Sequence, residues 1–138
     1  MPDIRFYPKG KTLNKYGNTK TMVDGLAFDS KAEAARYQEL KLLQKAGEIF
    51  NLELQPKYTL VPKTKKRRAV TYTADFRYLE YVPPKMHYRD GEDAAPTRVV
   101  VEDLKSPATA KNKAYIVKRN LFEYQNPDID FREIMYHG

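Results

Sequence analysis

The spacing of apolar and polar positions predicts a sheet flanked by helices. Apolar residues recur at helical spacing from Ala32 to Ala46; Ser30 and Glu33 form a capping-box pair at the start, and Gly47 is a stop signal. The predicted helices cover residues 30–46 and 113–125, and the predicted strands cover 49–55, 57–61, 70–80, 98–105 and 129–135. This order predicts an α/β (α+β) fold with a mixed central sheet.

The segments between these elements are polar or rich in turn-forming residues. Residues 1–24 are expected to form a basic N-terminal arm, and residues 25–138 a single domain. Pro56 must lie at a strand edge, a bend or a break, because it cannot donate a ladder hydrogen bond. Residues 83–96 are expected to form a loop or an open hairpin, and residues 106–112 a turn.

Composition narrows the range of partners. The 138 residues include 25 Lys or Arg and 18 Asp or Glu, which gives a formal net charge of +7 and favours a polyanion such as nucleic acid. The absence of cysteine excludes disulfides and zinc–thiolate sites. No apolar run approaches the ~20 residues of a membrane span, and the N-terminus has no apolar signal core. A cytoplasmic location is therefore expected.

Acidic residues occur where strand propensity disfavours them. Asp103 and Lys105 follow the run Val99–Val101, and because strand side chains alternate, both should point to the same face. Asp75 is a lone acid among strand formers. Such conflicts tend to occur at functional sites. Two acids and a lysine on neighbouring strands would form a divalent-metal site for phosphodiester cleavage.

The order of these motifs resembles the PD-(D/E)XK nuclease superfamily, which has the restriction-endonuclease-like fold. Residues 23–34, Leu54–Pro56, Tyr72–Phe76 and Val101–Lys105 are also similar to a family of small phage and prophage proteins assigned to that superfamily. The proline that names the superfamily is Ala74 here. The resemblance covers roughly Tyr16 to Ile134.

The resemblance implies a nuclease that uses Mg²⁺, with Mn²⁺ as a substitute. Asp75, Asp103 and the backbone carbonyl of Leu104 would hold the metal, and oxygen atoms are the ligands that Mg²⁺ prefers. Lys105 would orient or help to activate the attacking water, or stabilise the developing negative charge.

Glu33 and Gln55 each have two interpretations. The superfamily often places a glutamate on its first helix, so Glu33 would reach the metal directly or through water. Glu33 also fits the third position of a capping box, which needs no catalysis. Gln55 would approach the site according to the family motif, yet a glutamine before a proline is ordinarily a turn residue.

The expected partner is DNA. The candidate contacts to its backbone are the basic loop and one face of the second helix: Lys63, Lys65, Lys66, Arg67, Arg68, Lys113, Lys118 and Arg119. The expected function is that of a Mg²⁺-dependent endonuclease for branched DNA, resembling Holliday-junction resolvases. It would act as a homodimer in a bacterial cell and would be encoded by a phage or prophage. The alternatives are a nucleic-acid-binding module without catalysis and a small structural or assembly protein.

Overall fold

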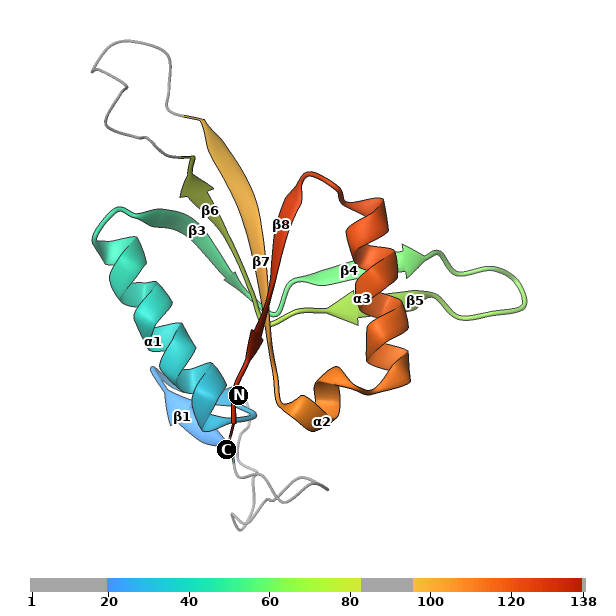
Figure 1. Cartoon of the computed structure of the whole chain (residues 1–138), viewed down its shortest axis with the longest axis horizontal. Helices are drawn as coiled ribbons and strands as arrows, with labels where there is room; N and C mark the ends of the chain where they lie inside the picture. Colours follow the sequence, from blue (N-terminus) through green and yellow to red (C-terminus); the bar gives the residue numbers. More distant parts are fainter. Residues whose placement is uncertain (1–19, 83–95, 138) are drawn as a thin grey trace. The chain divides into compact units, whose positions relative to one another are not determined.

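The computed structural model describes residues 20–82 and 96–137 (Figure 1). The chain divides into two compact units between Glu39 and Leu40. Helix α1 (Lys31–Lys45) runs across this boundary and agrees with the predicted helix 30–46. No helix in the described ranges is long and apolar enough to cross a membrane.

The first unit contains a short hairpin that the sequence did not predict. Strands β1 (Thr21–Val23) and β2 (Leu26–Phe28) pair antiparallel. Asp24 and Gly25 connect them with φ of 52° and 77°, and two consecutive positive φ angles are typical of the tight turn that joins hairpin strands. Part of the expected arm, residues 21–23, is therefore a strand, while residues 1–19 lie outside the described part.

The second unit contains a four-stranded sheet in the order β3–β6–β7–β8. Its strands are β3 (Ile49–Leu54), β6 (Phe76–Tyr81), β7 (Thr97–Lys105) and β8 (Ile129–Met135). The first three are antiparallel neighbours, and β8 lies parallel to β7. Helix α3 (Lys113–Gln125) connects β7 to β8, as a parallel pair requires. The predicted mixed sheet with flanking helices is confirmed.

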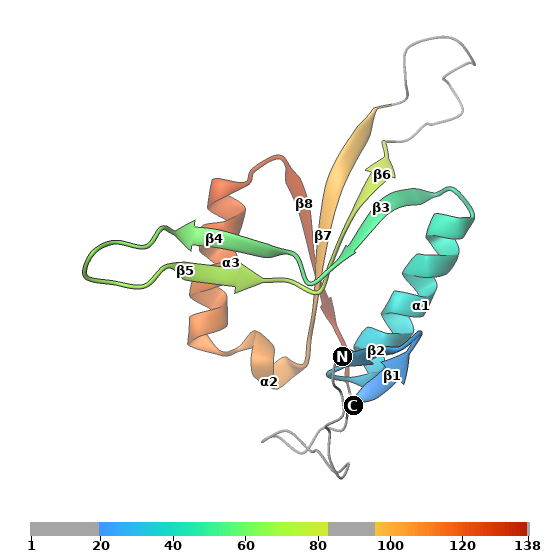
Figure 2. The ribbon, with the colours of Figure 1, turned by 180° about the vertical axis from the view of Figure 1, so that it is seen from behind.

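The prediction of one strand over residues 70–80 was wrong. Strand β5 (Val70–Thr73) pairs with β4 (Lys57–Val61) in a separate two-stranded sheet, and β6 starts only after Asp75. At the break, the Ala74 N–H donates to Pro56 O at 3.0 Å and the Gln55 N–H donates to Asp75 O at 2.8 Å. The β4–β5 hairpin therefore leaves the main sheet and returns to it at one place (Figure 2).

The segment after β7 is a short helix rather than the expected turn. Helix α2 (Pro107–Ala110) begins after Ser106, whose hydroxyl accepts a hydrogen bond from the Thr109 N–H, and Pro107 has the fixed φ that suits a first helical residue. The following helix α3 is capped by Asn112, whose side chain accepts from the Tyr115 N–H at 3.0 Å. Its bounds agree with the predicted helix 113–125.

One cluster joins the β4–β5 hairpin, α3 and the sheet. Phe122 is completely buried, and its ring centroid lies 4.7 Å from that of Tyr58 and 5.3 Å from that of Tyr72, both on the hairpin. Val101 of β7 and Phe131 of β8 complete this contact from the sheet. Because strand side chains alternate, Asp103 and Lys105 share the face of β7 that carries Val101.

Replacing Phe122 by alanine should remove the centre of this cluster. We expect Phe122→Ala to lower the free energy of unfolding by about 3–5 kcal/mol, the usual cost of emptying a phenylalanine site in a core. Tyr124→Ala, on the same helix but 82% exposed, should change it by less than about 0.5 kcal/mol. Urea denaturation of both variants measures the difference, and equal losses would contradict the assignment of the core.

Candidate active site

The carboxylate of Asp103 is buried and has two partners. The residue is 1% exposed. The Tyr72 hydroxyl donates to its Oδ2, and Lys105 Nζ lies 3.1 Å from its Oδ1. A buried charge without partners is strongly unfavourable. Both oxygens are thus satisfied by groups from β5 and from β7 itself, and the predicted proximity of Asp103 and Lys105 is confirmed.

Tyr72 is a member of the site that the sequence did not indicate. Burial, followed by the nearby negative charge of Asp103, raises the pKa of Tyr72 far above its ordinary value of 10.0. The hydroxyl therefore remains protonated throughout the physiological pH range. It acts as a permanent hydrogen-bond donor to Asp103.

Lys105 is held from a second side by an aromatic ring. Its Nζ lies 4.5 Å from the centroid of Tyr115 on α3, within the range of a cation–π interaction. The Tyr115 hydroxyl donates to Glu133 of β8, and Arg119 also donates to that carboxylate at 3.2 Å. Glu133 is the register partner of Asp103. The ammonium group is thus fixed between a carboxylate and a ring.

Asp75 is tied to the end of β7 by its backbone and its side chain. Its N–H donates to Glu102 O at 3.0 Å, and its Oδ2 accepts from the Leu104 N–H at 2.7 Å. The N–H and C=O of one strand residue point to the same edge of the strand. The carbonyl of Leu104 therefore faces the edge on which Asp75 lies. The β6–β7 register ends at Phe76↔Glu102, so no residue of β6 pairs with Leu104.

The described donors match the chemistry of a hard divalent cation in part. The carboxylates of Asp75 and Asp103 and the backbone carbonyl of Leu104 lie at the same end of β7. Mg²⁺ prefers oxygen ligands, takes only a few of them from the protein and keeps several waters. Within residues 20–82 and 96–137, no cluster of three or more His, Cys, Asp or Glu side chains is placed to hold a metal ion.

The remaining predicted site residues lie in different places. The Ser30 hydroxyl accepts from the Glu33 N–H at 3.1 Å, as the predicted capping box requires, but Glu33 belongs to the first unit. The backbone of Gln55 contacts Asp75, and its φ of 51° marks a sharp change of direction before Pro56. Lys63–Arg68 form the exposed tip of the β4–β5 hairpin.

The predicted cations of α3 do not form one surface. Arg119 is paired with Glu133, and its guanidinium lies 5.7 Å from the ring centroid of Tyr115. Lys113 is exposed, whereas Lys118 is half-buried. Of the three, Arg119 is therefore part of the polar surroundings of Lys105 through Tyr115 and Glu133.

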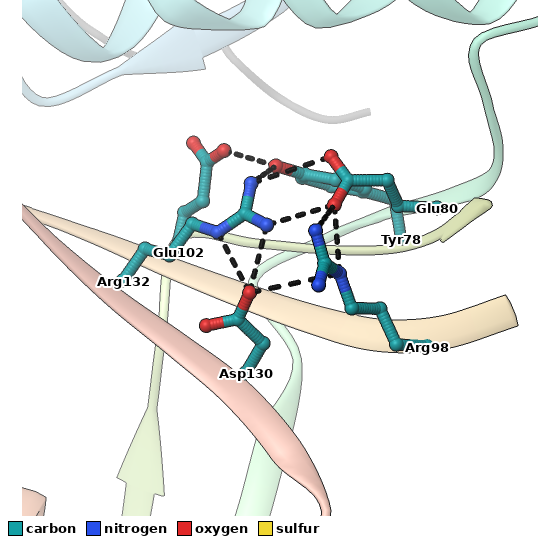
Figure 3. A network of polar contacts seen from close by, with 6 residues as sticks. All are labelled: Tyr78, Glu80, Arg98, Glu102, Asp130 and Arg132. Atoms are coloured by element: carbon teal, nitrogen blue, oxygen red, sulfur yellow. Dashed lines mark hydrogen bonds and ion pairs between the residues drawn. The ribbon is translucent and has the colours of Figure 1, made fainter. Parts of the chain in front are cut away.

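The opposite face of the sheet carries a separate ionic network (Figure 3). The completely buried Glu102 accepts from the Tyr78 hydroxyl, so Glu102 has a structural environment and is not solvent-exposed. Arg132 Nη2 lies 2.8 Å from Glu80 Oε1 and 2.7 Å from Asp130 Oδ2. Hydrogen bonds from Arg132, and then from Arg98, lower the pKa of Glu80. Glu102 and Asp103 thus differ in partners although they are adjacent and equally buried.

Comparison with known proteins identifies one family. A family model described as "Protein of unknown function (DUF1064)" matches residues 13–137. No curated protein and no solved structure matches the chain.

Removing the Tyr72 hydroxyl should destabilise the protein. Tyr72→Phe keeps the ring but leaves the buried Asp103 without one hydrogen bond, so we expect the free energy of unfolding to fall by about 1–3 kcal/mol. Tyr124→Phe, which removes an exposed hydroxyl, should change it by less than about 0.5 kcal/mol. Chemical denaturation of both variants tests this, and a loss below 0.5 kcal/mol in Tyr72→Phe would contradict the hydrogen bond.

The Glu80 network should stabilise the protein most above the ordinary pKa of a glutamate. Because the pKa of Glu80 is lowered from 4.5 in the folded state, its contribution is present above pH 4.5 and is lost as the pH falls through the folded value. Glu80→Gln should therefore lose less stability than the wild type between pH 5 and pH 3. Denaturation curves across this pH range would refute the idea if Glu80→Gln and the wild type ran parallel.

Proposed function

Since the chain belongs to the DUF1064 family, whose function is unknown, we propose from its site that it is a Mg²⁺-dependent DNA endonuclease. The observation that carries the proposal is the arrangement at the end of β7: the Asp103–Lys105 pair at 3.1 Å, with Asp75 bonded to the intervening Leu104 at 2.7 Å. The order of acid-bearing helix, Asp75, Asp103-Leu104-Lys105 strand, helix and parallel strand supports a restriction-endonuclease-like core.

In this proposal Asp75, Asp103 and the Leu104 carbonyl hold the metal ion. Bound there, Mg²⁺ would supply Lewis acidity toward the scissile phosphate and lower the pKa of a bound water. The chain's own contribution is rigidity, because Asp75 is fixed by two hydrogen bonds to β7 and Asp103 by Tyr72. A site held in this way loses little geometry when the substrate arrives.

Lys105 supplies a positive charge beside these carboxylates. Its Nζ is held between Asp103 and the ring of Tyr115, which restricts the four rotatable bonds of its side chain. From this position an ammonium group would orient a water molecule or stabilise the negative charge that develops on the phosphate. Tyr115 and Glu133 are positioning residues for Lys105, because they act on the reaction only through it.

The preferred substrate in the proposal is branched DNA, as in recombination or repair in a cell that carries the phage or prophage. Cutting two strands of a junction requires two sites, and 138 residues offer one, so the active species would be a homodimer. Glu33 is kept as a further metal ligand in the proposal. Its hydrogen bond to Ser30 is made by the backbone N–H. A Glu33→Gln variant would therefore test the carboxylate without removing this bond.

Two adjacent acids on β7 allow a matched test of catalysis. Asp103→Asn keeps the size of the side chain and an acceptor for the Tyr72 hydroxyl but removes the charge. Glu102→Gln makes the same change one residue earlier, at an equally buried position on the opposite face. With a labelled four-way junction and a linear duplex in Mg²⁺, Asp103→Asn should cut at least about 100-fold more slowly than the wild type, the usual scale for loss of one electrostatic catalytic group. Glu102→Gln should cut at the wild-type rate.

Controls separate catalysis from folding and binding. Both variants are compared by circular dichroism and by DNA binding in EDTA, and wild-type cleavage is repeated in Mn²⁺ and in EDTA. Metal-independent cutting, or equal rates for Asp103→Asn and the wild type, would disprove the proposed site. If the wild type binds DNA or RNA but cuts neither in any metal, the chain is a binding module.

A further inference from the structure

The β4–β5 hairpin carries a dense cluster of positive charge. The seventeen residues from Lys57 to Thr73 include six Lys or Arg and no Asp or Glu, a formal charge of +6, whereas the whole chain carries +7. Residues 1–24 add a formal charge of +3, and the rest of the chain carries −2. Among the described residues the excess of positive charge therefore lies in this hairpin, which indicates a local contact with a polyanion.

The tip of this hairpin is exposed and has a defined turn. Every residue from Val61 to Val70 is exposed. Within the turn the Thr64 N–H donates to Arg67 O at 3.0 Å, and the Thr64 hydroxyl accepts from the Arg67 N–H at 3.0 Å and from the Lys66 N–H at 3.3 Å. These bonds hold the cations at the tip, away from the core (Figure 2).

The base of the hairpin is anchored in the core. The Gln125 side chain of α3 donates to Leu60 O at 2.9 Å, and the rings of Tyr58 and Tyr72 pack on Phe122. An arm anchored at its base and charged at its tip loses little conformational freedom on binding, which favours affinity.

We infer that the β4–β5 hairpin is an arm that enters the major groove of B-form duplex DNA. The two strands of a ribbon lie about 4.8 Å apart, and their side chains widen it further. The major groove, about 12 Å wide, admits such a ribbon, whereas the minor groove is only about 6 Å wide. The tip cations would contact the phosphates that border the groove. Val61 and Val70, a register pair that is exposed just below the tip, would offer apolar contact to thymine methyl groups. The major groove of duplex RNA is deep and narrow, so it would exclude the arm.

The arm also connects DNA contact to the proposed site. Tyr72, at the base of the arm, donates to Asp103, while Lys63–Arg68 lie at the other end of the same hairpin. This part of the inference rests on the proposed function: a duplex bound by the tip would be held at a fixed distance from the end of β7. The binding itself does not depend on cleavage.

The test measures binding of the full chain without cleavage. Fluorescence anisotropy with a labelled 24-base-pair DNA duplex in EDTA is recorded at several salt concentrations. The tip variant combines Lys65→Gln, Lys66→Gln and Arg67→Gln. The control variant removes the same charge from α1 and combines Lys31→Gln, Lys41→Gln and Lys45→Gln. The tip variant should bind on the order of 10–100-fold more weakly at physiological salt, and the slope of log K against log salt should fall by about 3. The α1 control should keep the wild-type slope.

The same measurement with duplex RNA and single-stranded DNA of matched sequence tests the groove. The wild type should bind duplex DNA more tightly than either competitor. Equal affinity for duplex RNA or for the single strand would overturn the groove assignment, and an unchanged slope in the tip variant would overturn the arm. Tip-dependent binding without any cutting would instead retain the arm and refute the nuclease. Circular dichroism melting of each variant excludes loss of folding as the cause.

Discussion

The burial of one negative charge determines how the second unit is built around the end of β7. Asp103 is removed from water, so its two oxygens must find partners inside the protein. One partner, Tyr72, requires the β4–β5 hairpin to lie against the sheet, and the other, Lys105, lies in turn against Tyr115 of α3. Three elements that are distant in the sequence are thus held to one carboxylate. The aromatic packing around Phe122 supplies the hydrophobic energy for the same arrangement.

The two faces of β7 differ in the partners of their buried carboxylates. On one face, Glu102 accepts a hydrogen bond from Tyr78 beside an ionic network of two arginines and two further acids. On the other face, Asp103 accepts from the Tyr72 hydroxyl and pairs with the ammonium group of Lys105. An arginine-rich network holds its carboxylates in bidentate geometry and leaves them poorly suited to exchange partners. The partners of Asp103 form no such fork, because the Tyr72 hydroxyl and the Lys105 ammonium each contact one of its oxygens.

The sequence predicts the regular elements better than the connections that form the site. Both long helices and the strand that ends at Lys105 follow from the periodicity of apolar residues. The proximity of Lys105 to Asp103 follows from the alternation of side chains along that strand. The break at Asp75 does not, because most of residues 70–80 favour strands and the chain is redirected by backbone hydrogen bonds to Pro56 and Glu102. Tyr72 is one of eleven tyrosines, and only the tertiary contact distinguishes it. Glu133 did carry a signal, since it is an acid two residues after the inward-facing Phe131.

The two ends of the β4–β5 hairpin are hydrogen-bonded to each other, Gln55 to Asp75 and Ala74 to Pro56. The main sheet is therefore continuous across the point where the hairpin is inserted. The pairing of β3 with β6 runs up to Leu54 and Phe76, on either side of the insertion. Such an insertion is modular: its tip can change in length or charge during evolution, or be exchanged by engineering, without shifting Asp75 or the strand that carries Asp103. The constraint on such changes lies at the base: a replacement hairpin would need to retain Tyr72 for Asp103, and Tyr58 and Leu60 for the core around Phe122.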